Sequence, residues 1–147
     1  MSLNAETLVP NLMVDNITDT VDFYTNKLGF RLNMSVTEDK TGFHDQLQSD
    51  KDYIWAHVIN GPVEIMLQRR DSFERDVPAL QGADIGAAAT IYIRVKQVSS
   101  LFQQYTDAGI DVVKPLQTTW YGMKEFYITD NNGYVLCFGE MDETVQM

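Results

Sequence analysis

Apolar and polar positions follow the same pattern once in each half of the chain. In the first half, Ile17, Val21, Tyr24 and Leu28 recur at the spacing of one helix face. Gly29 follows directly, and glycine is the residue that most often ends a helix. The pattern therefore predicts a helix that begins near residue 17 and stops at Gly29.

The second half repeats this helix. Val98, Phe102 and Tyr105 form an apolar stripe at helical spacing, and Gly109 stands where the helix should stop. Each half also carries an Asn-Gly pair between two apolar runs, at residues 60–61 and 132–133. Asn-Gly between alternating apolar residues is the strongest local signal for a β-hairpin.

The remaining apolar runs have the length and alternation of strands. We expect strands at residues 8–14, 30–36, 53–59 and 63–68, and again at 89–95, 110–113, 123–129 and 134–138. Pro115 is expected to cut short the strand that starts at Ile110, because proline cannot donate to a strand ladder. Each half thus has the order β-α-β-β-β.

A repeated module of this size needs its twin to bury the face of its sheet. We therefore predict an α+β fold, in which two βαβββ modules form a curved, eight-stranded mixed sheet around a cleft. The predicted organisation is a tail at 1–7, a first module at 8–70, a polar linker at 71–87, a second module at 88–140 and an acidic, frayed tail at 141–147.

Composition indicates a globular chain without a membrane span. The 147 residues are enough for a real core, and 44% of them are hydrophobic, which is typical of folded proteins. No apolar run approaches the length of a membrane span, and the N-terminus lacks the pattern of a signal peptide. The single cysteine, Cys137, excludes an internal disulfide and fits a reducing compartment, so we expect a cytoplasmic protein.

The net charge of −10 narrows the class of partner. Nucleic acids and anionic membranes both require a cationic surface, so neither is an expected partner. An acidic protein can attract a cationic small molecule, although acidity also serves solubility alone.

Two longer motifs resemble a known family. The first half contains Val14-x-Asn16-Ile17-x-x-x-Val21-x-Phe23-Tyr24-x-x-x-Leu28-Gly29-Phe30. The second contains Trp120-Tyr121-Gly122-Met123-Lys124-Glu125-Phe126-x-x-x-Asp130-x-x-Gly133-Tyr134-x-x-x-Phe138-Gly139-Glu140. With the order of elements, these motifs resemble the vicinal-oxygen-chelate superfamily, which includes glyoxalase I, extradiol dioxygenases and bleomycin-resistance proteins. The second motif is most similar to the bleomycin-resistance members, and the resemblance covers residues 8–140.

The resemblance implies four metal-ligand positions, and this chain does not fill them with good ligands. Enzymes of the superfamily place His, Gln or Glu there, whereas matching the motifs gives Val9, Met66, Thr90 and Cys137. Valine and methionine are not ligands for hard metals, and threonine is a poor one. We therefore expect neither a metal nor another cofactor, and no glyoxalase-type catalysis in this register.

A different register would change that expectation. A shift of two residues along a strand keeps the same face and would bring Glu64 into the site in place of Met66. His57, on the neighbouring strand, would be the next available ligand. A metal-dependent lyase or isomerase of the glyoxalase type therefore stays open as the alternative.

Aromatic and acidic residues on the segments that line the cleft in this superfamily suggest what it holds instead. Aromatic rings beside carboxylates suit a flat or cationic organic ligand. The candidate ligand-binding residues are Trp55, His57, Glu64, Met66, Thr90, Tyr92, Trp120, Tyr121 and Glu125. Ordinary explanations also exist, since Trp55 could be simple sheet packing and Glu64 a solvated strand residue.

We therefore predict a non-enzymatic protein that sequesters a bulky, cationic small molecule in a metal-free cleft. The resemblance implies a role in antibiotic resistance and a homodimer, because relatives commonly dimerise. A third possibility is that the chain shares only the scaffold and binds an unrelated cytosolic ligand.

Overall fold

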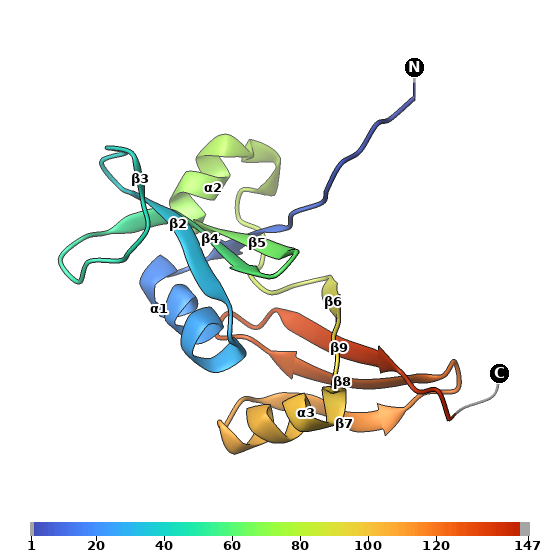
Figure 1. The fold of residues 1–147 in the computed structure, drawn as a ribbon. Coiled ribbons are helices and arrows are strands. Elements are labelled where there is room, and N and C mark those ends of the chain that lie inside the picture. The colour runs from blue at the N-terminus through green and yellow to red at the C-terminus, as the bar shows by residue number, and fades with distance from the viewer. Residues whose placement is uncertain (1, 145–147) are drawn as a thin grey trace. The chain divides into compact units, whose positions relative to one another are not determined.

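The computed structural model describes residues 2–144 as two compact units that meet between Ala83 and Asp84 (Figure 1). The first unit contains β1 (Asn11–Val14), α1 (Ile17–Asp22), the π-helical turn η1 (Phe23–Leu28), β2 (Arg31–Thr37), β3 (Phe43–His44), β4 (Tyr53–Asn60), β5 (Val63–Arg69), α2 (Arg70–Asp76) and the 3-10 turn η2 (Pro78–Leu80). The second contains β6 (Thr90–Arg94), α3 (Val98–Asp107), β7 (Val112–Thr118), β8 (Met123–Thr129) and β9 (Val135–Met141).

The two sheets have the same topology. Their strand orders are β1-β5-β4-β2-β3 and β6-β9-β8-β7. In each unit the first strand pairs in parallel with the last long strand, β1 with β5 and β6 with β9, and the other pairs are antiparallel. The predicted α+β fold of two βαβββ modules is confirmed, and the short β3 is an addition between the predicted strands at 30–36 and 53–59. That the two sheets together enclose a cleft stays a prediction.

The first helix begins and ends at the predicted residues. The side chain of Asn16 accepts a hydrogen bond from the backbone N–H of Asp19 at 2.8 Å, as an N-cap should. The helix widens into the π-helical turn η1 and stops at Gly29, whose φ of 91° lies in the left-handed region that glycine tolerates. The helix packs against β4 and β5.

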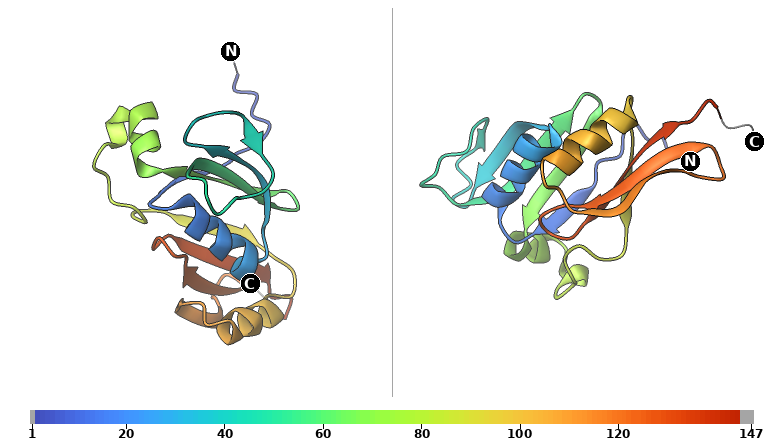
Figure 2. Two further views of the ribbon diagram at one scale, coloured as in Figure 1. Left: turned by 90° about the vertical axis from the view of Figure 1, so that its left-hand side faces the viewer. Right: turned by 90° about the horizontal axis from the view of Figure 1, so that it is seen from below.

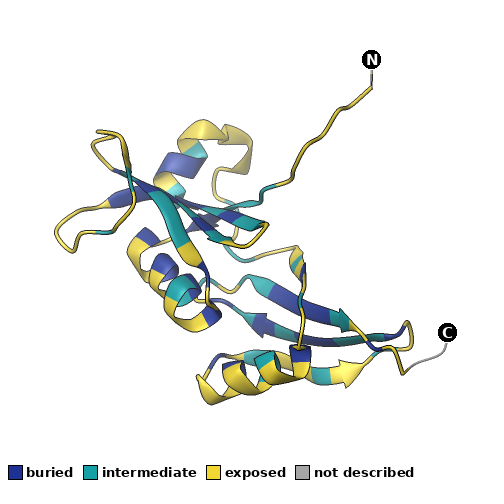
Figure 3. Cartoon of the chain, in the orientation of Figure 1, coloured by how far each residue is buried: buried dark blue, intermediate teal, exposed yellow. Residues whose placement is uncertain are grey.

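Alternation along β4 separates the core from the opposite face of the first sheet. Figure 3 shows buried segments on α1 and on the strands of the sheet. Ala56 and Val58 are fully buried, and because α1 contacts β4 we place them on the face that α1 covers. Trp55 and His57, which alternate with them, are only half-buried and point to the other face. The core therefore lies between sheet and helix, which leaves the second face available for a ligand.

Helix α3 lies against the second sheet (Figure 2), and an aromatic cluster holds it there. Phe126 of β8 and Phe138 of β9 stack with their ring centroids 5.3 Å apart, and Phe102 and Tyr105 of α3 meet Phe126 edge to face. Truncating one of these buried rings to alanine should cost ~3–5 kcal/mol. Because this cluster uses one face of β8 and β9, Glu125, Cys137 and Gly139 belong to the other face.

One local expectation was wrong, and two other segments carry structure that the sequence did not indicate. Pro115 does not cut the strand, because β7 is an edge strand and is irregularly paired beside the proline. The stretch expected as a polar linker contains α2, which buries Phe73. The tail expected to fray is held at Asp142, whose backbone N–H donates to the carbonyl of Gly122 at 2.8 Å. Residues 145–147 of that tail lie outside the described part of the chain.

None of the helices within residues 2–144 has both the length and the apolar character needed to cross a membrane.

Glu140 provides a direct test of this packing. Its carboxylate accepts hydrogen bonds from the backbone N–H groups of Val98 and Gln97, at 3.1 and 2.9 Å, at the start of α3. These bonds hold the pKa of Glu140 below its ordinary value of 4.5, with the Val98 bond as the largest cause. The stabilisation is therefore complete above pH 4.5 and is lost as the pH falls through the lower pKa of the folded state.

We expect Glu140→Gln to lower the Tm at pH 7, because a neutral amide oxygen is a weaker acceptor. The difference from the wild type should stay constant between about pH 6 and 8 and shrink toward zero near pH 3. Thermal melts across this range measure it, and Glu143→Gln, at an exposed carboxylate nearby, controls for the change in net charge. A difference that persists undiminished at pH 3 would contradict this role.

Candidate functional site

The face of the first sheet that lies opposite α1, which we call its outer face, brings four of the predicted residues together. Trp55 and His57 lie on β4, and Glu64 and Met66 lie on β5. His57 is paired directly with Met66, and Glu64 stands one pair further along the same face. Each of the four is half-buried, so the patch is accessible without being fully solvated.

His57 is the centre of this patch. Its Nε2 lies 2.9 Å from Oε1 of Glu64, and its Nδ1 lies 3.0 Å from Nδ2 of Asn33. An amide nitrogen can only donate, so Nδ1 is the acceptor and the Nε2–H group donates to Glu64. The ring of Trp55 lies nearly parallel to the imidazole, 12° apart in plane and 6.1 Å between centroids. Asn33, which orients the imidazole, carries no sequence signal that would have singled it out.

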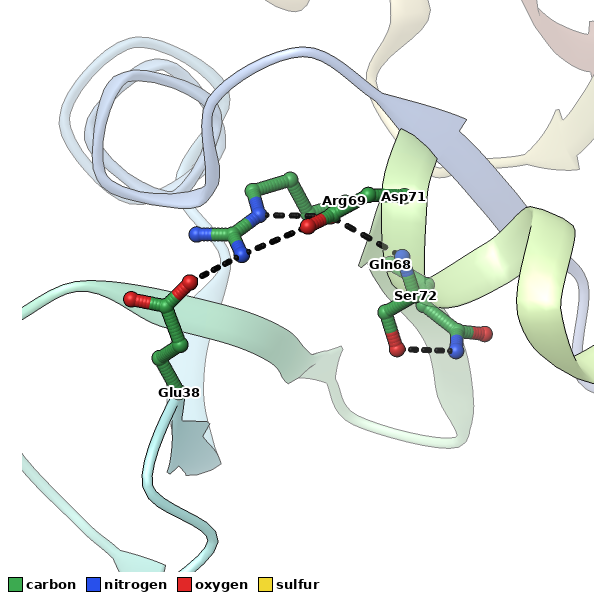
Figure 4. A network of polar contacts seen from close by, with 5 residues as sticks. All are labelled: Glu38, Gln68, Arg69, Asp71 and Ser72. Carbon is green, nitrogen blue, oxygen red and sulfur yellow. Dashed lines mark hydrogen bonds and ion pairs between the residues drawn. The ribbon is translucent and has the colours of Figure 1, made fainter.

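A second polar network lies at the end of β5 and also escaped sequence reasoning (Figure 4). The buried amide of Gln68 donates to Ser72 at 2.9 Å and accepts from Asn11 at 2.9 Å. Next to it, Arg69 binds Asp71 and Glu38 at 2.7 to 2.9 Å. The hydrogen bond from Arg69 lowers the pKa of Asp71. This network ties the start of α2 to the sheet, so we assign it a structural role.

The outer face of the second sheet carries a buried carboxylate held by two phenols. Glu125 on β8 is 2% exposed. The Tyr92 hydroxyl donates to its Oε2 at 2.6 Å, and the Tyr121 hydroxyl donates to its Oε1 at 2.7 Å. Desolvation, followed by the bond to Glu125, raises the pKa of Tyr92, and the bond to Glu125 raises the pKa of Tyr121. We call Tyr92, Tyr121 and Glu125 the tyrosine–carboxylate cluster.

The remaining two predicted residues are not part of either cluster. Trp120 is 86% exposed and touches Tyr121 edge to face, with 5.3 Å between centroids. Thr90 is exposed at the start of β6, opposite Val135. Trp120 can extend the aromatic surface beside Tyr121, whereas Thr90 makes no contact that assigns it a role.

The four positions at which the superfamily holds a metal do not fit one here. Val9 offers no donor atom, and Met66 only a soft thioether. Cys137 is fully buried, and burial raises the pKa of its thiol to about 11, so the thiolate that a metal requires is disfavoured. Within the described residues, no three His, Cys, Asp or Glu side chains are grouped to hold an ion.

The shifted register fares no better. Glu64 and His57, its two candidate ligands, are already bonded to each other, and Asn33 occupies the second ring nitrogen of His57. A metal could bind His57 only after one of these bonds is broken. We therefore derive no chemistry through a metal.

A cavity elsewhere in the first unit does not match an aromatic ligand. It has a volume of about 270 Å³ and follows β2. It is lined by Thr37, Glu38, Asp39, Asp50, Lys51 and Asp52, which include no ring. The two sheet faces differ from this cavity, because rings and carboxylates lie together there.

Comparison with known proteins identifies one family. The model of the "Glyoxalase/Bleomycin resistance protein/Dioxygenase superfamily" matches residues 7–138. No sequence match is found among curated proteins.

Solved structures agree in fold. TioX from Micromonospora sp. ML1 is 20% identical, with a TM-score of 0.65 over 93% of this chain and 99% of its own. A glyoxalase/bleomycin resistance protein/dioxygenase from Nocardioides is 16% identical, with a TM-score of 0.72 over 99% of this chain and 90% of its own. UcmS2 is 16% identical, with a TM-score of 0.65 over 93% and 98%. At these identities the likeness shows the fold alone.

The donor set leads to a prediction about metals. We expect the purified protein to contain well below one equivalent of Zn, Ni, Fe or Mn, and its Tm to stay unchanged after dialysis against a chelator. Elemental analysis and thermal melts measure both quantities. Stoichiometric metal that disappears in Glu64→Gln or His57→Gln would show that the shifted register is correct and that the protein is a metal-dependent enzyme.

Proposed function

Because the chain belongs to the glyoxalase/bleomycin resistance protein/dioxygenase superfamily, we propose that it binds a bulky, cationic small molecule and does not transform it. The observation that carries this proposal is the array on the first sheet, in which Trp55 lies parallel to His57 and His57 is bonded to Glu64. The array combines an aromatic surface with a partly exposed carboxylate, the two features that recognise a cationic aromatic compound.

Each part of the array has a distinct task. Trp55 supplies a face for stacking and for cation–π attraction, worth about 0.5–2 kcal/mol according to its desolvation. Glu64 uses Oε1 for His57, and within the described residues its Oε2 has no hydrogen-bond partner, so it can accept one from a ligand. His57 holds the carboxylate in place through a bond that is itself fixed by Asn33.

Charge and family support the same proposal. The net charge of −10 favours the approach of a cation over that of an anion. We extend the proposal to a homodimer in the cytoplasm that protects its host from a toxic compound such as a cationic antibiotic. A metal-dependent lyase would need ligands that Val9, Met66 and Cys137 do not provide.

The test is calorimetric titration with metal-free bleomycin and with a panel of cationic aromatic compounds, each beside a neutral analogue of the same shape. We expect micromolar binding of at least one cation. Glu64→Gln should weaken it about tenfold or more, because a hydrogen bond to a charged group contributes ~1.5–3 kcal/mol. The glutamine can still accept from His57, so the array should keep its geometry.

Asp19→Asn is the matched control, since it removes the same charge at an exposed position of α1, the helix that covers the opposite face of the sheet. It should change affinity less than about twofold. Trp55→Leu should weaken cationic and neutral aromatic ligands alike, because it removes the stacking surface. If no cation binds at micromolar concentration, or if Asp19→Asn and Glu64→Gln weaken binding equally, the proposal fails.

A further inference from the structure

Glu125 is a buried carboxylate without a cationic partner. Its two oxygens accept hydrogen bonds from the neutral hydroxyls of Tyr92 and Tyr121. Within residues 2–144, no lysine, arginine or histidine forms an ion pair with it. Buried charges in proteins are normally paired with an opposite charge, because removal from water is costly. A fold without use for this carboxylate would be expected to carry a neutral residue there.

The hydrogen bond between Tyr92 and Glu125 joins two strands that are not neighbours in the sheet. Tyr92 lies on the edge strand β6, Glu125 lies on β8, and β9 runs between them. Tyr92 is opposite Cys137 on β9, while Glu125 is opposite Gly139, two residues further along. The phenol therefore crosses β9 over Gly139 to reach the carboxylate.

Gly139 makes this crossing possible. A Cβ atom at position 139 would overlap the hydroxyl oxygen of Tyr92 and lie 2.8 Å from its Cζ. The atoms in conflict belong to the far end of one side chain, so the tyrosine can move while the strand stays in place. No positive φ explains this glycine, in contrast to those in the turns. The lack of a side chain is thus used to seat the Tyr92 ring.

We propose that Glu125 is a binding subsite for a cationic group that carries N–H donors, and that Tyr92 is its gate. The ammonium, amidinium or guanidinium group of a ligand replaces the Tyr92 hydroxyl on Oε2 of Glu125 and occupies the strip over Gly139 that the ring vacates. The inference goes beyond the proposed function, because it assigns to the second unit a cation-binding site of its own.

Position in the sheet identifies Tyr92 as the residue that moves. Tyr92 is 45% exposed and stands on an edge strand, so its ring can turn toward solvent without disturbing the core, whereas Tyr121, at 38% exposed, also packs against Trp120. Tyr121 keeps its bond to Oε1 at 2.7 Å and holds the carboxylate still. The resting protein therefore satisfies Glu125 with two neutral donors, and the ligand exchanges one of them for a charge-assisted bond.

The same geometry defines the class of cation. The carboxylate is almost fully buried, so losing the Tyr92 bond must be offset by a new hydrogen bond to Oε2. A primary ammonium, an amidinium or a guanidinium supplies one. A quaternary ammonium has no N–H group and would leave Oε2 unsatisfied, although it could still lie over an exposed aromatic ring.

The experiment compares 4-phenylbutylamine with its N,N,N-trimethyl analogue by calorimetry at pH 7. We expect the wild type to bind the amine at least about tenfold more tightly than the quaternary compound. Glu125→Gln should lose this preference, because the amide removes the charge. The glutamine can still accept from one phenol and donate to the other, which preserves the packing.

The gate is tested by two independent variants. Tyr92→Phe keeps the ring and removes the competing hydroxyl, and Gly139→Ala displaces the whole phenol. Both should bind the amine more tightly than the wild type, by about fivefold, because the ligand no longer competes with a hydrogen bond. Tyr127→Phe is the control. Tyr127 lies on β8, two residues from Glu125, and its hydroxyl forms a hydrogen bond with Cys137 instead of Glu125. This substitution should leave affinity unchanged.

The outcomes separate the gate, the subsite and the proposed function. Weaker binding in both Tyr92→Phe and Gly139→Ala would overturn the gate, because Tyr92 would then be helping to hold the ligand. Equal binding of the amine by the wild type and Glu125→Gln, or equal binding of amine and quaternary compound, would overturn the subsite. If cation binding remains sensitive to Glu64→Gln while Glu125→Gln has no effect, only the subsite fails and the proposed function stands. Absence of cation binding to every variant overturns both.

Discussion

The parallel pairing of the first and last long strands constrains everything else in each unit. When β1 lies beside β5, and β6 beside β9, the helix that follows the first strand has to cross one face of the sheet to reach the next strand. That face becomes the core, filled by residues such as Val58 and Phe126. The opposite face is then released from core packing and can carry polar side chains. The topology therefore determines which face of each sheet packs in the core and which face can carry polar side chains.

Strand alternation distributes the two kinds of residue with a period of two. On β8, Phe126 packs under α3 while its neighbour Glu125 serves the outer face. On β4, Val58 is buried against the helix while His57 reaches Glu64. The outer faces of both units carry a carboxylate beside aromatic rings, although different residues achieve it. In the first unit the partner of the carboxylate is an imidazole, and in the second it is a pair of phenols.

Much of the fold was predictable from the sequence, because its signals are local. The helix at 17–28, its Gly29 stop and the hairpin at 60–61 depend on residues a few positions apart. The prediction that Pro115 ends its strand was wrong because an edge strand tolerates proline. The position of a strand in its sheet is not a local property of the sequence. The helix α2 escaped because its polar sequence buries little besides Phe73.

The sequence indicated which residues were candidates for the sites, but it did not indicate which of them contact one another. Tyr92, Tyr121 and Glu125 were each suspected for their chemistry, yet the bond between Tyr92 and Glu125 depends on the register of three strands. Gly139 and Asn33 gave no signal, since the role of each follows from a neighbour distant in sequence. Pairwise register is the information that single-sequence patterns lack.

Two consecutive residues of β9 serve the two faces of the second sheet. Gly139 faces the tyrosine–carboxylate cluster, and the next residue, Glu140, turns to the other face and caps α3. A single-residue deletion before Gly139 would exchange their faces. A carboxylate would then fill the strip that the Tyr92 ring occupies, and the helix would lose its cap. Substitutions along β9 should therefore be tolerated more readily than changes in its length. The same alternation of side chains places Gly139 beside Tyr92 and Glu140 at the start of α3.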